Sequence, residues 1–267
     1  MNSSRRSFLK TTATASAAAF ASQLQGAAAT PAAAGREYYE LRAYRLKPGE
    51  PSALLEAYLE KALIPALNQR GVKSVGVFTE PETKDGPAIW VLIPHPTLES
   101  FASVSATLNA DPAVQQAAGD YWRAPTKTNP AFDRIDTWLH LAFSGLPKLQ
   151  LPATTRTKSP RIFELRTYPS FSELKALKKV QMFNSGEIDV MKEVGLSPVF
   201  YGQALAGRDL PHLSYMTSGP DMATHLEHWK VFGSHPIWTK LKNDPQYADT
   251  VGTITKRFLV PAAYSQI

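Results

Sequence analysis

The sequence predicts an α+β fold in which one small βαββαβ unit occurs twice and the two resulting sheets pack together. Residues 39–44 (YELRAY) recur 124 positions later as residues 163–168 (FELRTY). The same offset takes Gly71, which follows the first helical stretch, onto Gly195, which follows the second. A repeat of this length is too long for a solenoid unit, so it indicates duplication of a whole small domain.

Strand and helix periodicities follow one another in the same order in both copies. Alternating side chains predict strands, apolar residues at spacings of three and four predict helices, and Gly or Pro clusters predict turns. The first copy gives a strand at 38–46, a helix at 52–67, strands at 73–79 and 88–93, a helical region at 97–118 that is interrupted at Asp111-Pro112, and a strand at 132–143. The second gives a strand at 161–168, a helix at 171–194, strands at 197–205 and 210–217, helices within 220–242, and a strand at 250–260.

The order βαββαβ is that of the ferredoxin-like module, which has helices on one face of a four-stranded sheet. Because the other face must also be covered, we expect the two modules, in tandem, to pack their sheets as a dimeric α/β-barrel within one chain. Towards the end of each copy, 99–101 matches 227–229 and 109–112 matches 243–245. These growing offsets indicate insertions in the second copy.

The predicted domain organisation has four parts. They are an export signal with a short tail at 1–34, the first ferredoxin-like module at 35–143, a Pro-containing linker at 144–160 and the second module at 161–267. The signal has paired arginines, Arg5-Arg6, before Phe-Leu-Lys, then a weakly hydrophobic stretch and small residues at Ala27-Ala28-Ala29. This layout is that of a twin-arginine (Tat) signal peptide, so we expect export to the periplasm through the Tat machinery.

Composition and charge exclude several classes of function. The formal charge of the chain is +6, but residues 1–29 contribute three basic residues and no acid, which leaves +3 for the remainder. No basic patch interleaved with aromatics follows, so we expect no nucleic-acid partner. No apolar run long enough to span a membrane follows the signal. The absence of cysteine excludes disulfides, thiolate metal sites and a cysteine nucleophile.

The second copy resembles a known family. Residues 162–168 (IFELRTY) are similar to the opening of the NIPSNAP domain, and residues 225–261, with His228-Trp229-Lys230 and His235-Pro236, are similar to its end. The resemblance implies the ferredoxin-like barrel fold and a tendency to self-associate as a homo-oligomer, and it implies no particular reaction. The first copy lacks His-Trp at 100–101, so we expect any site to be asymmetric.

Alternation along a strand places Glu40, Arg42 and Tyr44 on one face and residues 39, 41 and 43 on the other. We expect the apolar set to lie under the helices and the Glu-x-Arg-x-Tyr set to point into the barrel, where it holds a ligand or forms a structural ion-pair network. The candidate ligand-binding residues are Glu40, Arg42, Tyr44, Glu164, Arg166, Tyr168, Tyr201, Tyr215, His228 and Trp229.

The histidines and aromatics allow further interpretations. His225, His228 and His235 have a spacing that could hold a metal, but packing or capping explains them better, and no metal or cofactor is expected. Aromatic side chains in both copies favour either core packing or a pocket for a small apolar or aromatic ligand.

Three functions remain open at this stage. The first is an exported binding protein for such a ligand, and the second is an oligomeric interaction module. The alternative is a cofactor-independent monooxygenase or isomerase acting on a small aromatic or keto compound, with Arg166, Tyr168 or His228 as the acting groups.

Overall fold

The computed structural model describes residues 35–49, 51–83 and 86–267. The export signal expected in residues 1–34 lies outside the described residues. Within the described ranges, no helix is long and apolar enough to cross a membrane.

Each half of the described chain has the order of elements expected from its periodicities. The first half, residues 35–143, contains β1 (Tyr38–Arg45), α2 (Ala53–Tyr58), a π-helical turn η1 (Leu59–Leu63), α3 (Ile64–Gln69), β2 (Gly76–Thr79), β3 (Ala88–His95), α4 (Leu98–Ala110), α5 (Pro112–Ala118), α6 (Asp120–Arg123) and β4 (Arg134–Ala142). Helix α4 begins where the Thr97 side chain accepts a hydrogen bond from the Ser100 backbone, a normal N-cap.

The second half, residues 161–267, repeats that order. It contains β5 (Ile162–Pro169), α8 (Glu173–Met182), a π-helical turn η2 (Phe183–Glu187), α9 (Ile188–Glu193), β6 (Ser197–Ala206), β7 (His212–Gly219), α10 (Met222–Ser234), α11 (Pro236–Lys242), η3 (Pro245–Tyr247) and β8 (Thr255–Pro261). One short helix, α7 (Ala153–Arg156), lies in the segment expected to be a linker, where Leu149 and Leu151 pack against the barrel interior.

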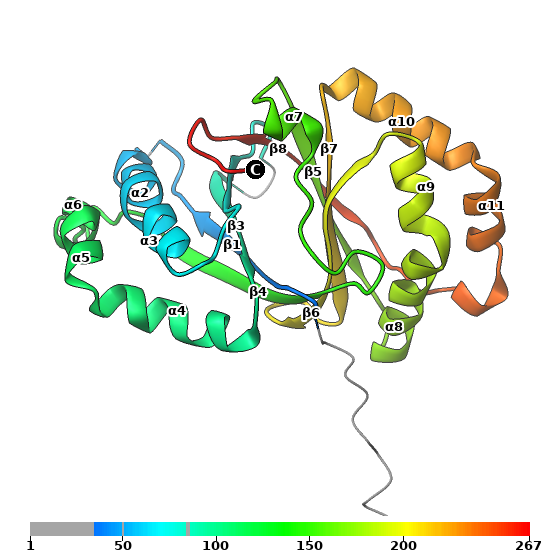
Figure 1. Cartoon of the computed structure of the whole chain (residues 1–267), viewed down its shortest axis with the longest axis horizontal. Coiled ribbons are helices and arrows are strands. Elements are labelled where there is room, and N and C mark those ends of the chain that lie inside the picture. The colour runs from blue at the N-terminus through cyan, green and yellow to red at the C-terminus, as the bar shows by residue number, and fades with distance from the viewer. Residues whose placement is uncertain (1–34, 50, 84–85) are drawn as a thin grey trace, which may run out of the picture. The chain divides into compact units, whose positions relative to one another are not determined.

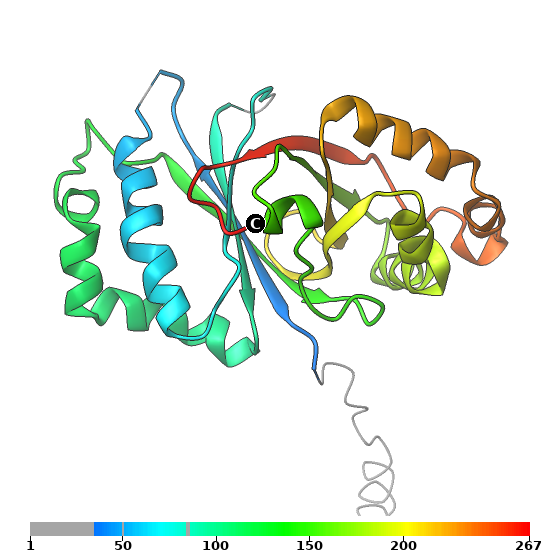
Figure 2. The same ribbon diagram turned by 45° about the horizontal axis from the view of Figure 1, so that its top comes forward.

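The eight strands close into one antiparallel barrel in the order β1-β3-β2-β8-β5-β7-β6-β4. Each half contributes four neighbouring strands, and the halves join where β2 pairs with β8 and β4 pairs with β6. The helices of the first half lie on one side of the barrel and α8 to α11 on the opposite side, as Figure 1 and the turned view of Figure 2 show. An α+β fold with a closed barrel is therefore confirmed.

The faces of the strands are the reverse of those expected. One apolar cluster combines residues of both halves and so fills the barrel interior: Tyr39, Leu41, Ala43, Phe78, Trp90, Leu92, Ala142, Phe163, Leu165, Val199, Phe200, Met216, Leu259 and Ile267. The Glu-x-Arg-x-Tyr sets, Glu40 to Tyr44 and Glu164 to Tyr168, lie instead between the sheet and the helices. Their expected position inside the barrel is wrong, because large apolar side chains from both sheets fill that space.

Equivalent residues of the two halves remain 124 positions apart over a longer part of the chain than the sequence indicated. Asp221 caps α10 as Thr97 caps α4, and His235 caps α11 as Asp111 caps α5. The matches of 99–101 with 227–229 and of 109–112 with 243–245 are therefore wrong, the first by one helical turn. The offset changes only before the last strand, because Glu40 faces Leu139 and Glu164 faces Phe258, a separation of 119. The second half is thus the shorter one there.

Candidate functional site

Each half buries a glutamate and an arginine two residues apart on its central strand. Arg42 Nε donates to Glu40 Oε1 at 2.6 Å, and Arg166 Nε donates to Glu164 Oε1 at 2.7 Å. Both carboxylates are almost fully buried. Burial opposes ionisation of Glu164, but a hydrogen bond from His225 and the charge of Arg166 together hold its pKa below the ordinary value. The pKa of Glu40 is likewise held low.

A histidine completes this unit in each half, but it comes from a different element. In the first half His95, at the end of β3, places Nε2 3.1 Å from Glu40 Oε2. In the second half His225, on α10, places Nε2 2.8 Å from Glu164 Oε2. The strand position equivalent to His95 is Gly219, and a Cβ there would lie 2.8 Å from His225 Cβ. The glycine therefore makes room for the helix histidine.

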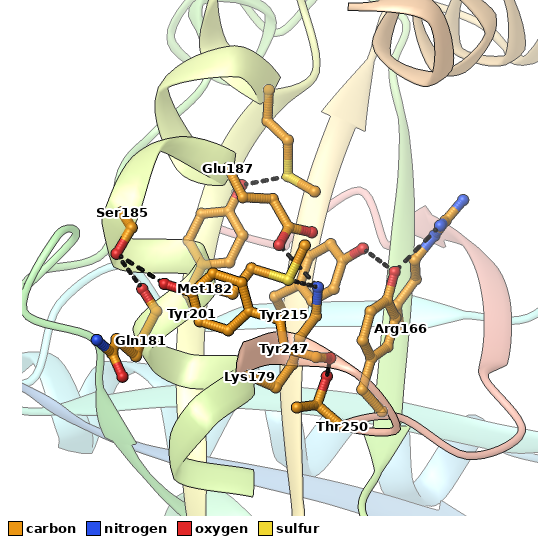
Figure 3. Close-up of polar contacts among 12 residues, drawn as sticks. Arg166, Lys179, Gln181, Met182, Ser185, Glu187, Tyr201, Tyr215, Tyr247 and Thr250 are labelled. Carbon is orange, nitrogen blue, oxygen red and sulfur yellow. Dashed lines mark hydrogen bonds and ion pairs between the residues drawn. The ribbon is translucent and has the colours of Figure 1, made fainter. Parts of the chain in front are cut away.

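In the second half, aromatic side chains of the protein cover the Glu164–Arg166 pair. The guanidinium of Arg166 lies 3.5 Å from the centroid of a Trp229 ring, and Trp229 Nε1 donates to Glu164 Oε2 at 2.6 Å. Tyr168 and Tyr215 share a hydrogen bond of 2.8 Å between their hydroxyls. Figure 3 shows Arg166 and Tyr215 of this network, with Lys179 beside them. The predicted residues Glu164, Arg166 and Tyr168 are thus brought together, in a packed region.

The remaining predicted residues of the second half are more scattered. Tyr201 is fully buried, and its hydroxyl donates to Met191 Sδ at 3.0 Å. Burial raises the pKa of Tyr201 and of Tyr215. The ring of His228 packs against Gly195, away from Glu164. Among the described residues, no three His, Asp or Glu side chains are grouped as metal ligands.

A buried ion pair lies beside this network. Lys179 Nζ is 2.7 Å from Glu187 Oε2, and both side chains are almost inaccessible to solvent. Burial raises the pKa of Glu187, and the charge of Lys179 opposes that rise. The ammonium group also lies 4.7 Å from the ring centre of Phe183 and 5.3 Å from that of Trp238. Neither residue lines the cavities described below, and we treat the pair as a structural element.

A cavity of about 400 Å³ opens at one end of the barrel interior. Strands of both halves line it, with Leu41, Ala43 and Trp90 on one side and Leu165, Thr167 and Ser214 on the other. This volume lies within the range of pockets that take small organic molecules. The apolar cluster fills the rest of the interior, so the cavity ends inside the protein.

Two tryptophans and their charged partners form one wall of this cavity. The rings of Trp90 and Trp138 are nearly parallel, with centroids 6.1 Å apart and an interplanar angle of 16°. Arg257 lies 5.1 Å from the Trp90 ring centre and pairs with Glu80 at 3.0 Å. On the other ring, Arg208 lies 5.6 Å from the Trp138 centre and pairs with Asp136 at 3.0 Å. The wall therefore offers aromatic faces held in place by ion pairs.

Two buried histidines lie near the cavity, and one of them, His140, is two residues from Trp138 on β4. His212 lines the cavity, and its ring centre is 5.7 Å from that of His140. None of their four ring nitrogens makes a hydrogen bond of standard geometry within the described part of the chain, but backbone groups of Tyr39 act on His140, and those of Leu213 and Arg208 act on His212. Burial, assisted by His212, lowers the pKa of His140 to about 3, and burial also lowers the pKa of His212. Of the two imidazoles, only that of His212 lines the cavity, so it is the one that a ligand there could contact.

The sequence did not single out these barrel residues. Trp90 and Trp138 were considered only as part of the general aromatic content, and His140 and His212 were not considered. One signal could have found them. Tyr39, Leu41 and Ala43 form the apolar face of β1, and its partner β4 places Trp138 and His140 on the same side of the sheet as those residues.

The site and the fold together define a class: a single-chain antiparallel α/β barrel with a ligand-sized cavity at one end. The chain belongs to the NIPSNAP family, whose profile matches residues 39–122 and 163–266. No curated protein matches the chain by sequence.

Solved structures of similar fold include two proposed monooxygenases. One, from Fusobacterium nucleatum, has a TM-score of 0.55 at 10% identity and covers 85% of this chain and 93% of its own. The other, from Lactobacillus acidophilus, has a TM-score of 0.53 at 6% identity and covers 85% and 94%. A NIPSNAP-like domain protein from Burkholderia xenovorans is 18% identical over 39% of this chain and 88% of its own, with a TM-score of 0.36. At these identities the first two likenesses establish the fold alone.

Replacing Lys179 by Met is expected to destabilise the protein by about 3–5 kcal/mol, because Glu187 is left buried without its partner. The double variant Lys179→Met/Glu187→Leu should recover most of this loss, since it removes both charges. Urea unfolding followed by circular dichroism measures both. Lys178→Met, on the solvent side of the same helix, is the control and should change little. A double variant as unstable as the single one would contradict this assignment.

Acid should weaken the fold through His140. Its pKa in the folded protein is about 3 against an ordinary value of 6.5, so the unfolded chain binds the extra proton between these values. Stability is therefore full above about pH 6.5 and falls as the pH drops towards 3, by up to about 1.4 kcal/mol per pH unit. Thermal unfolding at pH 4 to 8 measures this slope. It should be shallower in His140→Met and unchanged in His228→Met; equal slopes in all three proteins would refute the prediction.

Proposed function

We propose that this NIPSNAP-family protein binds a small planar aromatic molecule, bearing a hydroxyl or keto group, in the cavity at the barrel mouth. The observation that carries the proposal is the pair of near-parallel rings of Trp90 and Trp138 in the lining, together with polar side chains. Among these polar side chains, Thr167 and Ser214 share a hydrogen bond of 3.1 Å. Aromatic faces suit a planar ring. The hydroxyl groups of Thr167 and Ser214 and the ring of His212 suit its polar substituent.

Balanced charge at the cavity supports an uncharged ligand. Arg45 and Arg208 both contact Asp136, and Arg257 contacts Glu80. Asp209 also lines the cavity, which therefore has three arginines and three carboxylates. Because these guanidinium groups already have carboxylate partners, a ligand does not need its own negative charge to enter. Their role is to hold the tryptophan rings and the cavity mouth in position.

We further propose two features of organisation. Each half is a ferredoxin-like module, which the strand orders β4-β1-β3-β2 and β8-β5-β7-β6 support. The chain is exported by the Tat route to the periplasm, which Arg5-Arg6 and the small residues at 27–29 support. Self-association stays a prediction from the family resemblance; three exposed apolar side chains near the start of α8, Phe171, Leu174 and Leu177, favour it.

We do not assign the alternative enzymatic function to the groups first considered for it. Arg166 is covered by Trp229, and Tyr168 is bonded to Tyr215 inside the second half. His228 lies against Gly195. None of these side chains lines the barrel cavity, so a monooxygenase or isomerase reaction there would need other residues.

Native mass spectrometry of the purified full chain tests the proposal directly. We expect a co-purifying aromatic molecule of one or two rings. Where the protein emerges empty, isothermal titration calorimetry with 2-naphthol should detect binding. Trp138→Leu should weaken that binding at least tenfold by removing one wall, whereas Trp238→Leu, in the helices of the second half, should leave it unchanged. Equal affinity in the wild type and Trp138→Leu would refute a barrel site.

Export is tested with the arginine pair. We expect Arg5→Lys/Arg6→Lys to leave the protein in the cytoplasmic fraction of a bacterium that has the Tat machinery, with the N-terminal segment retained. The wild type should appear in the periplasmic fraction, shortened at its N-terminus, as intact-mass measurement would show. Lys10→Arg, which keeps the pair and the charge, is the control. Equal export of wild type and pair variant would contradict the Tat assignment.

A further inference from the structure

A second cavity, of about 250 Å³, lies outside the barrel, between the sheet and helices of the first half. Arg42 and Tyr44 of β1 form part of its lining. Its other walls come from the helices and from β4: Tyr58, Leu63, Ser105, Leu108, Asn109, Tyr121, Trp122 and Ile135. The cavity therefore contains two of the residues that the sequence selected, in a place that the sequence did not predict.

In the second half a tryptophan covers the equivalent position. Ser105 is eight residues after the cap of α4, and Trp229 is eight residues after the cap of α10. The two residues thus occupy the same place on equivalent helices. In the second half the indole of Trp229 covers Arg166, with 3.5 Å between the guanidinium carbon and a ring centre. In the first half the serine leaves the space above Arg42 open.

The second half therefore shows what this position accepts. The Trp229 ring stacks on the guanidinium of Arg166, a favourable cation–π arrangement. Its Nε1 donates to the carboxylate that the arginine also contacts. A flat aromatic ring with an N–H group satisfies both partners at once.

The first half keeps the arginine of this arrangement at the cavity, whereas Glu40, whose Oε2 contacts His95, does not line it. Arg42 uses Nε for Glu40 and Nη1 for Tyr44, and its Nη2 makes no hydrogen bond within the described ranges. Tyr58 and Tyr121 stack at 4.0 Å with an interplanar angle of 5°, beside Trp122. Burial raises the pKa of both tyrosines, so they stay neutral at physiological pH. The site presents a guanidinium group and aromatic walls without further charge.

We propose that this first-half cavity is a second binding site, which takes a planar aromatic ring system of about the size of indole, stacked on Arg42 in the position that Trp229 fills in the second half. The geometry makes Ser105 the residue that keeps the site open. The site is separate from the barrel mouth because the two cavities share no lining residue.

Indole is the probe that tests the proposal, by equilibrium dialysis against the full chain. Ser105→Trp is expected to fill the cavity with the protein's own ring and to lower the number of indole molecules bound per chain by one. Ser103→Trp, an exposed position on the same helix, should bind as many as the wild type. Ser105→Phe serves if the tryptophan variant does not fold. Unchanged stoichiometry in a folded Ser105 variant, or no binding by the wild type, would overturn the proposal.

The second half supplies an independent test. Trp229→Ser copies the residue of the first half and should open an equivalent cavity, which lowers the melting temperature. Millimolar indole should then raise the melting temperature of Trp229→Ser by several degrees more than that of the wild type. Trp238→Ser, which removes a nearby indole that does not cover Arg166, should show no such gain. If indole raised the melting temperature of Trp229→Ser no more than that of the other two proteins, Trp229 would not be a valid model for the ligand.

Discussion

The buried Glu–Arg pair on the central strand of each half is the constraint on which the surrounding structure depends. A carboxylate and a guanidinium between a sheet and its helices are stable only when their hydrogen-bonding capacity is used. Each half therefore supplies a histidine to the second oxygen of the glutamate and a tyrosine to the arginine. These partners position α4 and α10, the helices that follow the third strand of each half. Each of these helices must carry either the histidine itself or an aromatic ring that packs on the histidine.

The exchange between His95 and His225 illustrates this dependence. Where the histidine is on the strand, the helix carries Phe101, whose ring meets His95 edge-on at 5.7 Å. Where the histidine is on the helix, the strand carries Gly219. Either arrangement brings an imidazole Nε2 to the glutamate, and a mixture of the two would leave a clash or an unpaired oxygen. The contact is common to both halves, although the residues that make it occupy different positions.

The fold could largely be predicted from the sequence, whereas the orientation of the strands could not. The duplicated YELRAY and FELRTY segments and the periodicities located every strand of the barrel within a few residues. Alternation shows that Glu40 and Tyr39 point in opposite directions, but it does not show which side faces the helices. That choice depends on the volume inside the closed barrel, which Tyr39 and Phe200 fill from two different halves. Such long-range packing leaves no local pattern.

The same limit explains why the candidate sites were only partly predicted. Arg42 and Tyr44 were identified because the repeat singles them out, and the barrel-mouth residues were missed because nothing repeats them. Trp138 and His140 belong to the first half, and their counterparts on β8 are Arg257 and Leu259. The tryptophan and histidine of the barrel cavity are therefore a product of divergence between the halves, although Leu41 and Ala43, with Leu165 and Thr167, line it from the duplicated segments.

Divergence also accounts for the asymmetry outside the barrel. Trp229 contributes buried apolar area and a hydrogen bond to the second half, and both are absent at Ser105. A half that stabilised only itself would gain by acquiring the same ring, because the equivalent arginine and glutamate are already in place. The first half instead surrounds the open position with Tyr58, Tyr121 and Trp122. These three aromatic side chains surround a gap above a buried guanidinium, and no described side chain of the first half fills that gap. An aromatic ligand would supply the ring that the second half supplies with Trp229.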